Sequence, residues 1–416
     1  MTPKQSPDVG PEIIDPTFYA RDGYPHETFK RLRDEAPVYW YGDHTVPFWA
    51  ITRHADIVEV SRQPELFSNL PHFQILAGAE FGSSDSREPD TIIQMDPPRH
   101  RLYRELISRR FTPRALREVE AALEPVADEV ISALESEARE GEIDFVERIA
   151  APFPMTVISW LLDVPREDWP MLYDWSCAVV TPNDPDYKHE GESAHEARLR
   201  ASQSLYEYFG KLGEERRHGD GDDLVSLLAR AEIDGRPLDP HVLASYYLLL
   251  IVGGNETTRN AISGGMHALI ERPALWDEIA ADPSKVDAAK EEFVRWSTPV
   301  VQMARTATRD TELHGQRIRK GEAVALFYAS ANRDERIFRQ PFEFRLDRHP
   351  NPHLGFGVGE HFCIGSHLAR MQIRAMLNRL IARFERFEFT QPATRLVASS
   401  VGGWKTLPVR YAFKKH

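Results

Sequence analysis

The sequence predicts a mainly α-helical protein built around one long central helix, with a small β-rich region. Apolar residues recur at helical spacing through most of the chain, and residues 240–269 are apolar on nearly all sides in their first half, as in a buried helix. Segments rich in β-branched and aromatic residues are short. No Gly/Ser linker, repeat or low-complexity segment divides residues 1–416, so we expect one continuous domain with a loosely ordered tail over residues 1–14.

The other expected elements follow in chain order. A short helix is predicted at residues 26–34, and strands at residues 38–40 and 47–52. Residues 70–94 hold several glycines and little periodicity, which predicts a long loop, and long loops in compact domains usually carry function. Amphipathic spacing predicts helices at residues 118–137, 155–162, 169–179, 194–216 and 286–296. An extended segment is predicted at residues 298–303, strands at 317–326, a short helix at 327–333 and a β-turn at 401–404.

Composition excludes several classes of protein. The chain of 416 residues carries a formal net charge of −13, which argues against a nucleic-acid partner. Its two cysteines, Cys177 and Cys363, lie in unrelated contexts, so no disulfide framework is expected and a reducing cytoplasm fits. The polar N-terminus does not resemble a signal peptide, and the longest apolar run, residues 246–252, is too short to cross a membrane. We therefore expect a cytoplasmic protein without a membrane anchor.

A glycine-rich loop at residues 353–365 places Cys363 directly before an apolar-periodic helix. Backbone N–H groups point outward at a helix N-terminus, and this position lowers the pKa of a thiol. The glycines allow a flat ligand to approach the backbone closely, and a cysteine thiolate is one of the axial ligands of haem iron. Two alternatives are a small buried apolar residue and a zinc site with His361 and His367, whose spacing suits zinc poorly.

The predicted central helix contains a polar segment, Gly-Gly-Asn-Glu-Thr-Thr, at residues 253–258. Glycines and polar side chains inside a buried helix cost free energy, so we expect the segment to have a functional or packing role. A carboxylic acid next to an alcohol, as at Glu256 and Thr257, is suited to guiding protons. A helix kink or a packing notch is the alternative.

Four motifs, in order along residues 15–413, resemble those of the cytochrome P-450 superfamily. The polar segment matches the family's central helix, and His100 with Arg104 matches its His-x-x-x-Arg helix. Glu292 and Arg295 match its Glu-x-x-Arg pair, a structural device for which Arg348 is the expected third partner. The cysteine loop matches the haem-binding signature without departure, at Phe356, Gly357, Gly359, His361, Cys363 and Gly365.

This resemblance implies the P-450 fold and a haem b cofactor, with Cys363 as the axial thiolate and metal ligand. It implies Glu256 and Thr257 as the catalytic pair. The implied cofactor-binding residues are His100, Arg104, Arg305, Phe356, Gly357, His361, Cys363 and Gly365. The expected substrate pocket is lined by Leu249, Val252, Gly253, Val300 and Val301. In the family the loop at residues 70–94 covers this pocket, where Phe73, Ile75, Leu76 and Phe81 are expected either to line it or to serve as ordinary loop anchors.

The implied function is a monooxygenase that hydroxylates a hydrophobic small molecule with O2 and two externally supplied electrons. The expected electron donors are a ferredoxin and an NAD(P)H-dependent ferredoxin reductase, because no flavin-binding segment is recognised. A basic group, Arg101, Arg109, Arg110 and Arg114, is either a docking patch for this acidic donor or a solvated helix face.

The substrate is less well defined by the sequence than the chemistry. The motifs resemble the bacterial branch that acts on steroids, branched lipids, alkanes and terpenoids, so a steroid or terpenoid is expected. A fatty-acid or alkane hydroxylase is the first alternative. A peroxide-driven peroxygenase is disfavoured because the Glu256–Thr257 pair is intact. A haem sensor or electron carrier without chemistry of its own, and an enzyme of biosynthetic coupling or dehydration, are further alternatives.

Overall fold

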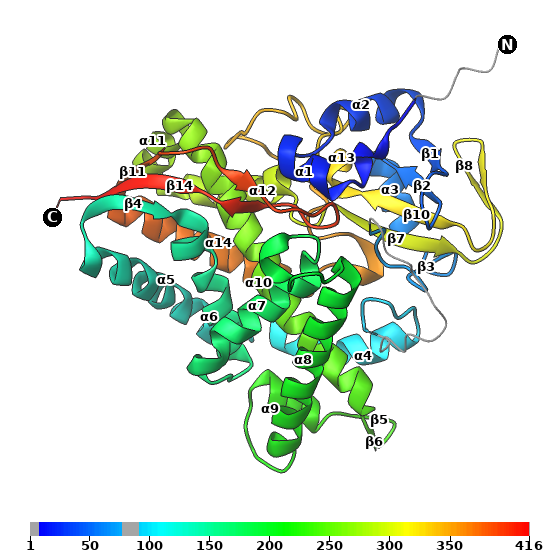
Figure 1. Ribbon diagram of the computed structural model, residues 1–416, viewed down its shortest axis with the longest axis horizontal. Coiled ribbons are helices and arrows are strands. Elements are labelled where there is room, and N and C mark those ends of the chain that lie inside the picture. The colour runs from blue at the N-terminus through cyan, green and yellow to red at the C-terminus, as the bar shows by residue number, and fades with distance from the viewer. Residues whose placement is uncertain (1–7, 77–90, 416) are drawn as a thin grey trace.

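The central helix predicted from the sequence is α10 (Pro240–Glu271), which runs through the middle of the molecule (Figure 1). The computed structural model describes residues 8–76 and 91–415. The side chain of Asp239 accepts a hydrogen bond from the His241 N–H and caps the helix, with Pro240 in its first turn. The helix is continuous through residues 253–258. The polar segment therefore does not mark a break in the helix.

Helices surround α10 and supply most of the core. Those before it are α1 (Pro16–Asp22), α2 (His26–Glu35), α3 (His54–Ser61), α4 (Arg99–Ser108), α5 (Arg117–Glu137), α6 (Pro152–Leu161), α7 (Trp169–Val180), α8 (Ala194–Arg216) and α9 (Leu224–Ala229). Those after it are α11 (Pro273–Ala281), α12 (Val286–Ser297), α13 (Tyr328–Ala331) and α14 (Ser366–Arg383). The helices predicted at residues 118–137, 194–216 and 286–296 agree with α5, α8 and α12 to within one residue.

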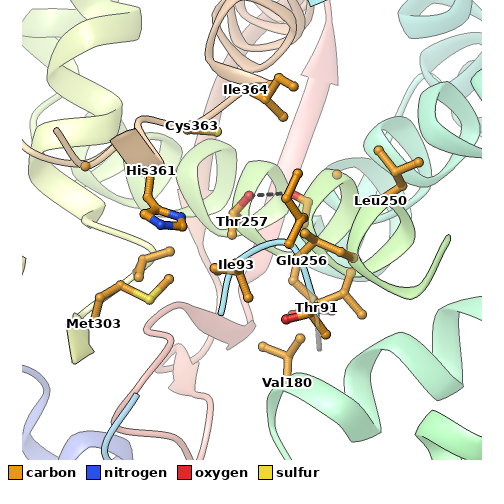
Figure 2. A pocket seen from close by; sticks show the side chains of 18 of the residues that line it. Thr91, Ile93, Val180, Leu250, Glu256, Thr257, Met303, His361, Cys363 and Ile364 are labelled. Carbon is orange, nitrogen blue, oxygen red and sulfur yellow. Dashed lines mark hydrogen bonds between the residues drawn. The ribbon is translucent and has the colours of Figure 1, made fainter. Parts of the chain in front are cut away.

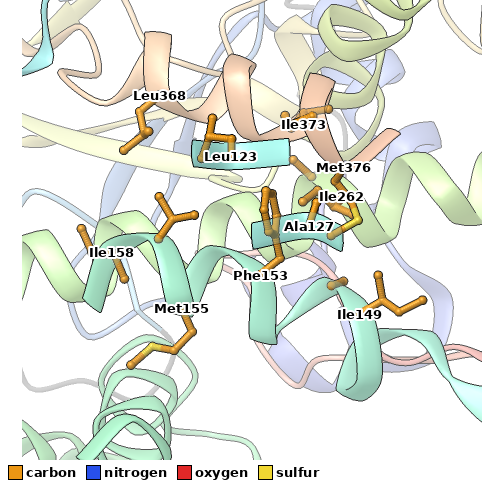
Figure 3. Close-up of a cluster of buried hydrophobic side chains, with 14 of the residues drawn as sticks. Leu123, Ala127, Ile149, Phe153, Met155, Ile158, Ile262, Leu368, Ile373 and Met376 are labelled. Atoms are coloured by element: carbon orange, nitrogen blue, oxygen red, sulfur yellow. The ribbon is translucent and has the colours of Figure 1, made fainter. Parts of the chain in front are cut away.

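A hydrophobic cluster joins α5, α6, α10 and α14, as Figure 3 shows. Phe153 of α6 and Ile373 of α14 are fully buried in it, together with Ile262 of α10. Burying a side chain of this size contributes about 1.5–3 kcal/mol. This packing fixes α14 against α10, and so places the loop that ends at Cys363, just before α14, beside the polar segment of α10.

Two glycines allow α10 and α12 to pack closely. A Cβ atom at Gly265 would overlap the ring of Phe293, and one at Gly264 would lie 2.6 Å from the Cβ of Ser297. The helices approach closely because α10 carries glycine at the two positions that Phe293 and Ser297 of α12 contact. It holds α12, which carries Glu292 and Arg295, against the centre of the molecule.

A five-stranded sheet lies beside the helical body, at the right in Figure 1. Its strands, in spatial order, are β1 (Val38–Tyr41), β2 (Phe48–Ile51), β10 (Ala323–Phe327), β7 (Gln302–Ala307) and β3 (Phe67–Ser68). Strand β10 runs parallel to β2, with Ala325 opposite Ala50, and the other pairs are antiparallel. All residues of β2 and β10 are buried, which explains their apolar sequences. The sheet carries Arg305 on β7 to the cavity described below.

The remaining strands form small sheets. One contains β11 (Phe384–Phe389), β14 (Pro408–Phe413) and β4 (Glu140–Asp144), and three pairs are β5 (Glu232–Ile233) with β6 (Arg236–Pro237), β8 (Thr311–Leu313) with β9 (Gln316–Ile318), and β12 (Thr394–Arg395) with β13 (Trp404–Thr406). The segment before β13 reaches back to the cavity, because Val401 forms a bridge with Val300 and lines the same space.

The N-terminal segment differs from the loose tail expected over residues 1–14. Val9, Ile13 and Ile14 are buried in a cluster with Phe29 and Leu32 of α2. Burial of these three apolar side chains offsets much of the entropy that the segment loses on being ordered. Residues 1–7 lie outside the described residues. Within the described ranges, the structure contains no helix with the length and apolar character needed to span a membrane.

Candidate active site

A cavity of about 660 Å³ lies beside the polar segment of α10. Its walls come from the Cys363 loop, α4, α8 and α10, the segment at residues 91–94 and the strand β7 with the residues before it. Figure 2 shows Glu256 and Thr257 between Cys363 on one side and Thr91 and Val180 on the other. Most of the lining is apolar, so the cavity suits a large hydrophobic molecule whose orientation is fixed by a few polar groups.

Backbone hydrogen bonds and glycine conformations shape the Cys363 loop. The Cys363 N–H donates to the Phe356 carbonyl at 2.9 Å, which closes the loop under the sulfur. Gly357 has a φ of +67°, a left-handed conformation that favours glycine. A Cβ atom at Gly365 would lie 3.9 Å from the Cys363 Sγ, in ordinary van der Waals contact, so this glycine adjoins the sulfur. Phe356, Gly357 and Gly365 line the cavity with Cys363, as predicted.

The pKa of the Cys363 thiol differs from the sequence prediction. Burial raises its pKa, although the Gly365 N–H and the charges of Arg104 and Arg370 act in the opposite direction. The sequence prediction, that the helix N-terminus lowers this pKa, is therefore wrong for the protein alone, because loss of hydration outweighs the helix end. A metal ion that coordinates a thiol removes its proton.

A cluster of cationic and imidazole side chains lines the cavity near Cys363. Arg305 is 5% exposed, and within the described part of the chain its side chain hydrogen-bonds only the Ala304 carbonyl, at 2.7 Å. The Nδ1 atom of His100 is buried and has no hydrogen-bond partner there. Arg104 donates to the Phe362 carbonyl at 2.6 Å. A buried guanidinium without a counter-ion is costly, so this cluster fits an anionic ligand.

Two residues that the sequence analysis missed hold His361 in this cluster. Asn69 donates to the Nε2 atom of His361 at 2.7 Å, and Asp96 accepts hydrogen bonds from the backbone and side chain of Asn69. Burial lowers the pKa of His361 to about 2, and the charges of Arg305, His100 and Arg104 act in the same direction. His361 is therefore neutral at physiological pH. No local motif marks Asn69, because it comes from β3 and its loop, 292 residues away along the chain.

These features together fit haem. A sulfur ligand faces a cavity edged by glycines, and Arg305, without a counter-ion, and His100, with an unpartnered Nδ1 atom, could serve the propionates of haem. The zinc alternative is not supported, because the described residues contain no group of three or more potential metal-ligating side chains. The donor set, one cysteine with arginine and imidazole side chains beside it, suits a haem thiolate site.

Glu256 and Thr257 are neighbours in the polar segment of α10, but their side chains have different surroundings. Thr257 is part-buried, lines the cavity and donates to the Gly253 carbonyl at 2.9 Å, the dashed line in Figure 2. Glu256 is fully buried, and its carboxylate accepts hydrogen bonds from Arg259 at 2.5 Å and from the Cys177 thiol at 2.8 Å.

The partners of Glu256 form a buried network between α7 and α10. Arg259 is 1% exposed, and it donates to the Tyr173 hydroxyl at 2.5 Å. Burial raises the pKa of the Cys177 thiol, and the neighbouring Glu256 carboxylate raises it further, so the thiol stays protonated and donates. The sequence analysis predicted the pair Glu256–Thr257, but neither Cys177 nor Arg259 as its supports.

Four of the five residues predicted to line the substrate pocket line the cavity, and Val301 does not. Leu249, Val252, Gly253 and Val300 line the cavity, and a Cβ at Gly253 would meet open space. Val301 is instead buried in the cluster around α1 and α2, because successive side chains of an extended segment point to opposite sides. In the loop over residues 70–94, Phe73 and Leu76 line the cavity.

Two further apolar residues of this loop, Ile75 and Phe81, were expected to line the cavity or to anchor the loop. Ile75 is buried in the same cluster as Val301, whereas Phe73 and Leu76 line the cavity. Phe81 lies outside the described residues.

The Glu-x-x-Arg pair forms the expected three-residue lock. Glu292 and Arg295 have no exposed side-chain surface, and their hydrogen bonds measure 2.6 and 2.7 Å. Arg348 donates to the same carboxylate at 3.2 Å, which confirms the predicted third partner, and the Asn351 amide adds a bond of 3.1 Å. Burial alone would raise the pKa of Glu292, but these partners outweigh it and lower the pKa.

Comparisons with known proteins agree with this geometry. The family model for cytochrome P-450 matches residues 5–409. The methyl-branched lipid omega-hydroxylase of Mycobacterium tuberculosis is 36% identical, over 99% of this chain and 96% of that protein. The steroid C26-monooxygenase of the same species is 37% identical, over 98% of this chain and 94% of that protein.

Superposition on a solved structure supports the same fold. The Mycobacterium marinum cytochrome P-450 in complex with pseudoionone superposes with a TM-score of 0.90 and 35% identity, over 97% of this chain and 99% of that one. The match covers all of the elements that build the cavity. The chain therefore belongs to the cytochrome P-450 family, and it is a monooxygenase that binds haem b with a cysteine thiolate, Cys363, as the axial ligand.

Proposed function

We propose that this protein hydroxylates an unactivated C–H bond of a steroid or a terpenoid. The observation that carries the proposal is a mostly apolar cavity that reaches from the Cys363 loop past Thr257 to helix α8. A relative named for a steroid and a structural neighbour that holds pseudoionone support a substrate of this size and polarity. The relative named for methyl-branched lipids favours the alternative, a fatty-acid or alkane hydroxylase.

The residues around Cys363 have distinct roles in holding the cofactor. Haem, when bound, activates O2 and inserts one oxygen atom into the substrate, and the axial thiolate supports this chemistry. Cys363 provides that thiolate, and Gly365 of its loop adjoins the sulfur. His100, Arg104, Arg305 and His361 would hold the propionates, which satisfies the buried cationic groups described above.

The Glu256–Thr257 pair would deliver the protons that the reaction consumes. The Thr257 hydroxyl faces the cavity and is free to exchange its bond with the Gly253 carbonyl for one to a bound molecule. Glu256 lies next to it but is held by Arg259 and Cys177, so one of these hydrogen bonds must open before the carboxylate can pass a proton on. The surrounding apolar wall keeps bulk water from this step.

Electrons would arrive from a ferredoxin reduced by an NAD(P)H-dependent reductase. Arg110 and Arg114 are exposed beside α4, and within the described ranges neither has an ion-pair partner. Arg101 is paired with Glu360, next to the Cys363 loop, and Arg109 with Glu105. Two exposed cations without an ion-pair partner, on the same basic segment as Arg101, suit an acidic donor in an acidic protein, while a solvated helix face stays the alternative.

Optical titration of the ferric holoenzyme tests the substrate. A steroid with an intact side chain, a monoterpenoid and a linear fatty acid would be compared, followed by turnover with a ferredoxin, its reductase and NADH. We expect a low-to-high-spin shift with the steroid or the terpenoid, and a hydroxylated product. A shift and product with the fatty acid alone would favour the alternative hydroxylase. A haem protein that binds all three but forms no product would be a sensor or carrier.

Replacing Thr257 with alanine is expected to separate electron use from product formation. Without the hydroxyl, proton delivery would be less well controlled, so NADH consumption should continue while product formation falls about tenfold. This loss is smaller than the roughly 10²–10⁴-fold effect of a positioned proton donor, because water can partly replace the hydroxyl. Thr257→Ser keeps a hydroxyl and is the matched control. Equal product per NADH in the alanine and serine variants would remove Thr257 from the proton path.

A further inference from the structure

The charged side chains that line the cavity divide into groups with different partners. His100, Arg104, Arg305 and His361 surround the cofactor loop, and Glu256 is neutralised by Arg259. One further charged side chain, Arg198 of α8, lines the cavity in the described part of the chain. Neither the cofactor nor the proton pathway accounts for this arginine.

Arg198 belongs to one continuous face of α8. Residues 198, 199, 202, 203 and 206 follow the spacing of a helix face, and all of them line the cavity. Leu199 is 39% exposed and Gln203 is exposed, so this stretch of α8 forms part of the rim, where the cavity meets solvent.

Arg198 and Ser202 lie one helical turn apart, and both side chains are part-buried. Within the described residues, Arg198 has no ion-pair or hydrogen-bond partner for its guanidinium, and Ser202 has none for its hydroxyl. Neighbouring Arg200 differs, because it is paired with Glu192 at 2.8 Å and does not line the cavity. The helix therefore directs one unpaired guanidinium and one unpaired hydroxyl toward the cavity.

We propose that Arg198 and Ser202 form a carboxylate-binding subsite, and that the substrate is an acidic amphiphile. A guanidinium binds a carboxylate through two parallel hydrogen bonds, and a hydroxyl one turn away supplies a third donor. At the rim the carboxylate keeps part of its hydration, so the cost of burying its charge is small. The apolar body then lies in the cavity, and the end farthest from the carboxylate reaches the Cys363 side.

This subsite rests on the proposed function and narrows it. The carboxylate held at the rim orients the molecule, so oxidation falls on the opposite end of the apolar body rather than beside the acid. Steroid side-chain acids, terpenoid acids and fatty acids all share this chemistry. The subsite thus specifies the polar end of the substrate, while the apolar wall specifies the rest.

Titration of the ferric holoenzyme with matched acids and esters tests the proposal. The probes are hexadecanoic acid with its methyl ester, and a steroid side-chain carboxylic acid with its methyl ester. Each pair has almost the same apolar body but differs in charge. The variants are Arg198→Ala, Arg198→Lys, Ser202→Ala and Arg236→Ala, the last being an exposed arginine on β6 that removes the same charge away from the cavity.

The expected result is a selective loss of acid binding. Arg198→Ala should raise the Kd of the acid about tenfold, as for the loss of one charge-assisted interaction, and leave the Kd of the ester within about twofold. Ser202→Ala should raise the Kd of the acid by a smaller factor, Arg198→Lys should retain most of the acid affinity, and Arg236→Ala should change neither ligand. Higher salt should weaken the acid and not the ester.

Other outcomes distinguish a failure of the subsite from a failure of the proposed function. Equal losses for acid and ester in Arg198→Ala would show a packing role, and unchanged acid binding would show no role; either overturns the subsite. If the esters still shift the spin state and are hydroxylated, the proposed function stands without it. If neither member of either pair perturbs the haem spectrum, the subsite is overturned, and so is a steroid as the substrate in the proposed function.

Discussion

Replacing Cys363 with alanine is expected to abolish the thiolate absorption of the reduced carbon monoxide complex, together with all hydroxylation activity. Alanine offers no ligand atom, and no other side chain of the Cys363 loop carries a sulfur. The loop itself should keep its shape, because its backbone bond from the Cys363 N–H to the Phe356 carbonyl does not need the side chain. Absorption spectroscopy, with circular dichroism to verify the fold, measures the effect.

The second cysteine of the chain is the matched control. Cys177 is fully buried between α7 and α10 and donates to Glu256, so Cys177→Ala removes a thiol without touching the iron ligand. Its thiolate spectrum should be that of the wild-type protein. A Cys363→Ala protein that retained the spectrum, or a Cys177→Ala protein that lost it, would contradict the assignment of the axial ligand.

Replacing Glu292 with glutamine is expected to lower the free energy of unfolding by about 3–5 kcal/mol, because it leaves a buried guanidinium without its counter-charge. Arg295 is fully buried and Arg348 nearly so, and both donate to the Glu292 carboxylate. The Asn351 amide and the Arg345 N–H donate to the same carboxylate. Glutamine would replace one of its accepting oxygens with an NH2 group, which would then face these N–H donors without an acceptor. Chemical denaturation of the holoenzyme, followed by circular dichroism and the haem absorption, measures the loss.

A pair on the same helix gives the control. Asp287 and Lys290 of α12 have the same i,i+3 spacing, but the Asp287 side chain is 64% exposed. Asp287→Asn should change stability by less than about 1 kcal/mol, as expected for a solvated ion pair. Equal effects of Glu292→Gln and Asp287→Asn would show that the buried lock does not stabilise the fold.

The same lock gives a pH dependence of defined sign. The pKa of Glu292 is lowered in the folded protein, so its contribution to stability is fully present above the ordinary value of 4.5 and is lost as the pH falls through the lower folded value. The Glu292→Gln protein should therefore lose less stability than the wild-type protein between neutral and acidic pH.

Features with a local cause were predictable from the sequence. The helix at residues 194–216 agrees with α8 because its start is a capping box, in which Ser193 and Glu196 bond each other's backbone N–H groups. The position of Cys363 follows from the glycines of its own loop, whose conformations are decided within a few residues. Arg348 was predicted as the third partner of Glu292 through the resemblance to the family, whose Glu-x-x-Arg pair binds a further residue upstream of the cysteine loop.

Features that depend on distant parts of the chain were decided only by the tertiary structure. Val300 and Val301 have the same chemistry, and which of them faces the cavity depends on how the segment before β7 is seated between α10 and the sheet. The pKa of Cys363 was predicted in the wrong direction, because the helix end is local but burial is not.

The sequence by itself determined the family, the iron ligand, the acid–alcohol pair and the central helix, because each is encoded by neighbouring residues. The tertiary structure decided what surrounds them. It brings Asn69 to His361, Cys177 to Glu256 and the unpaired Arg198 to the rim of the cavity, from segments with no sequence relation to one another. The physical reason is that hydrogen bonds and burial act over a few ångströms in space, whereas motifs record only what is close along the chain.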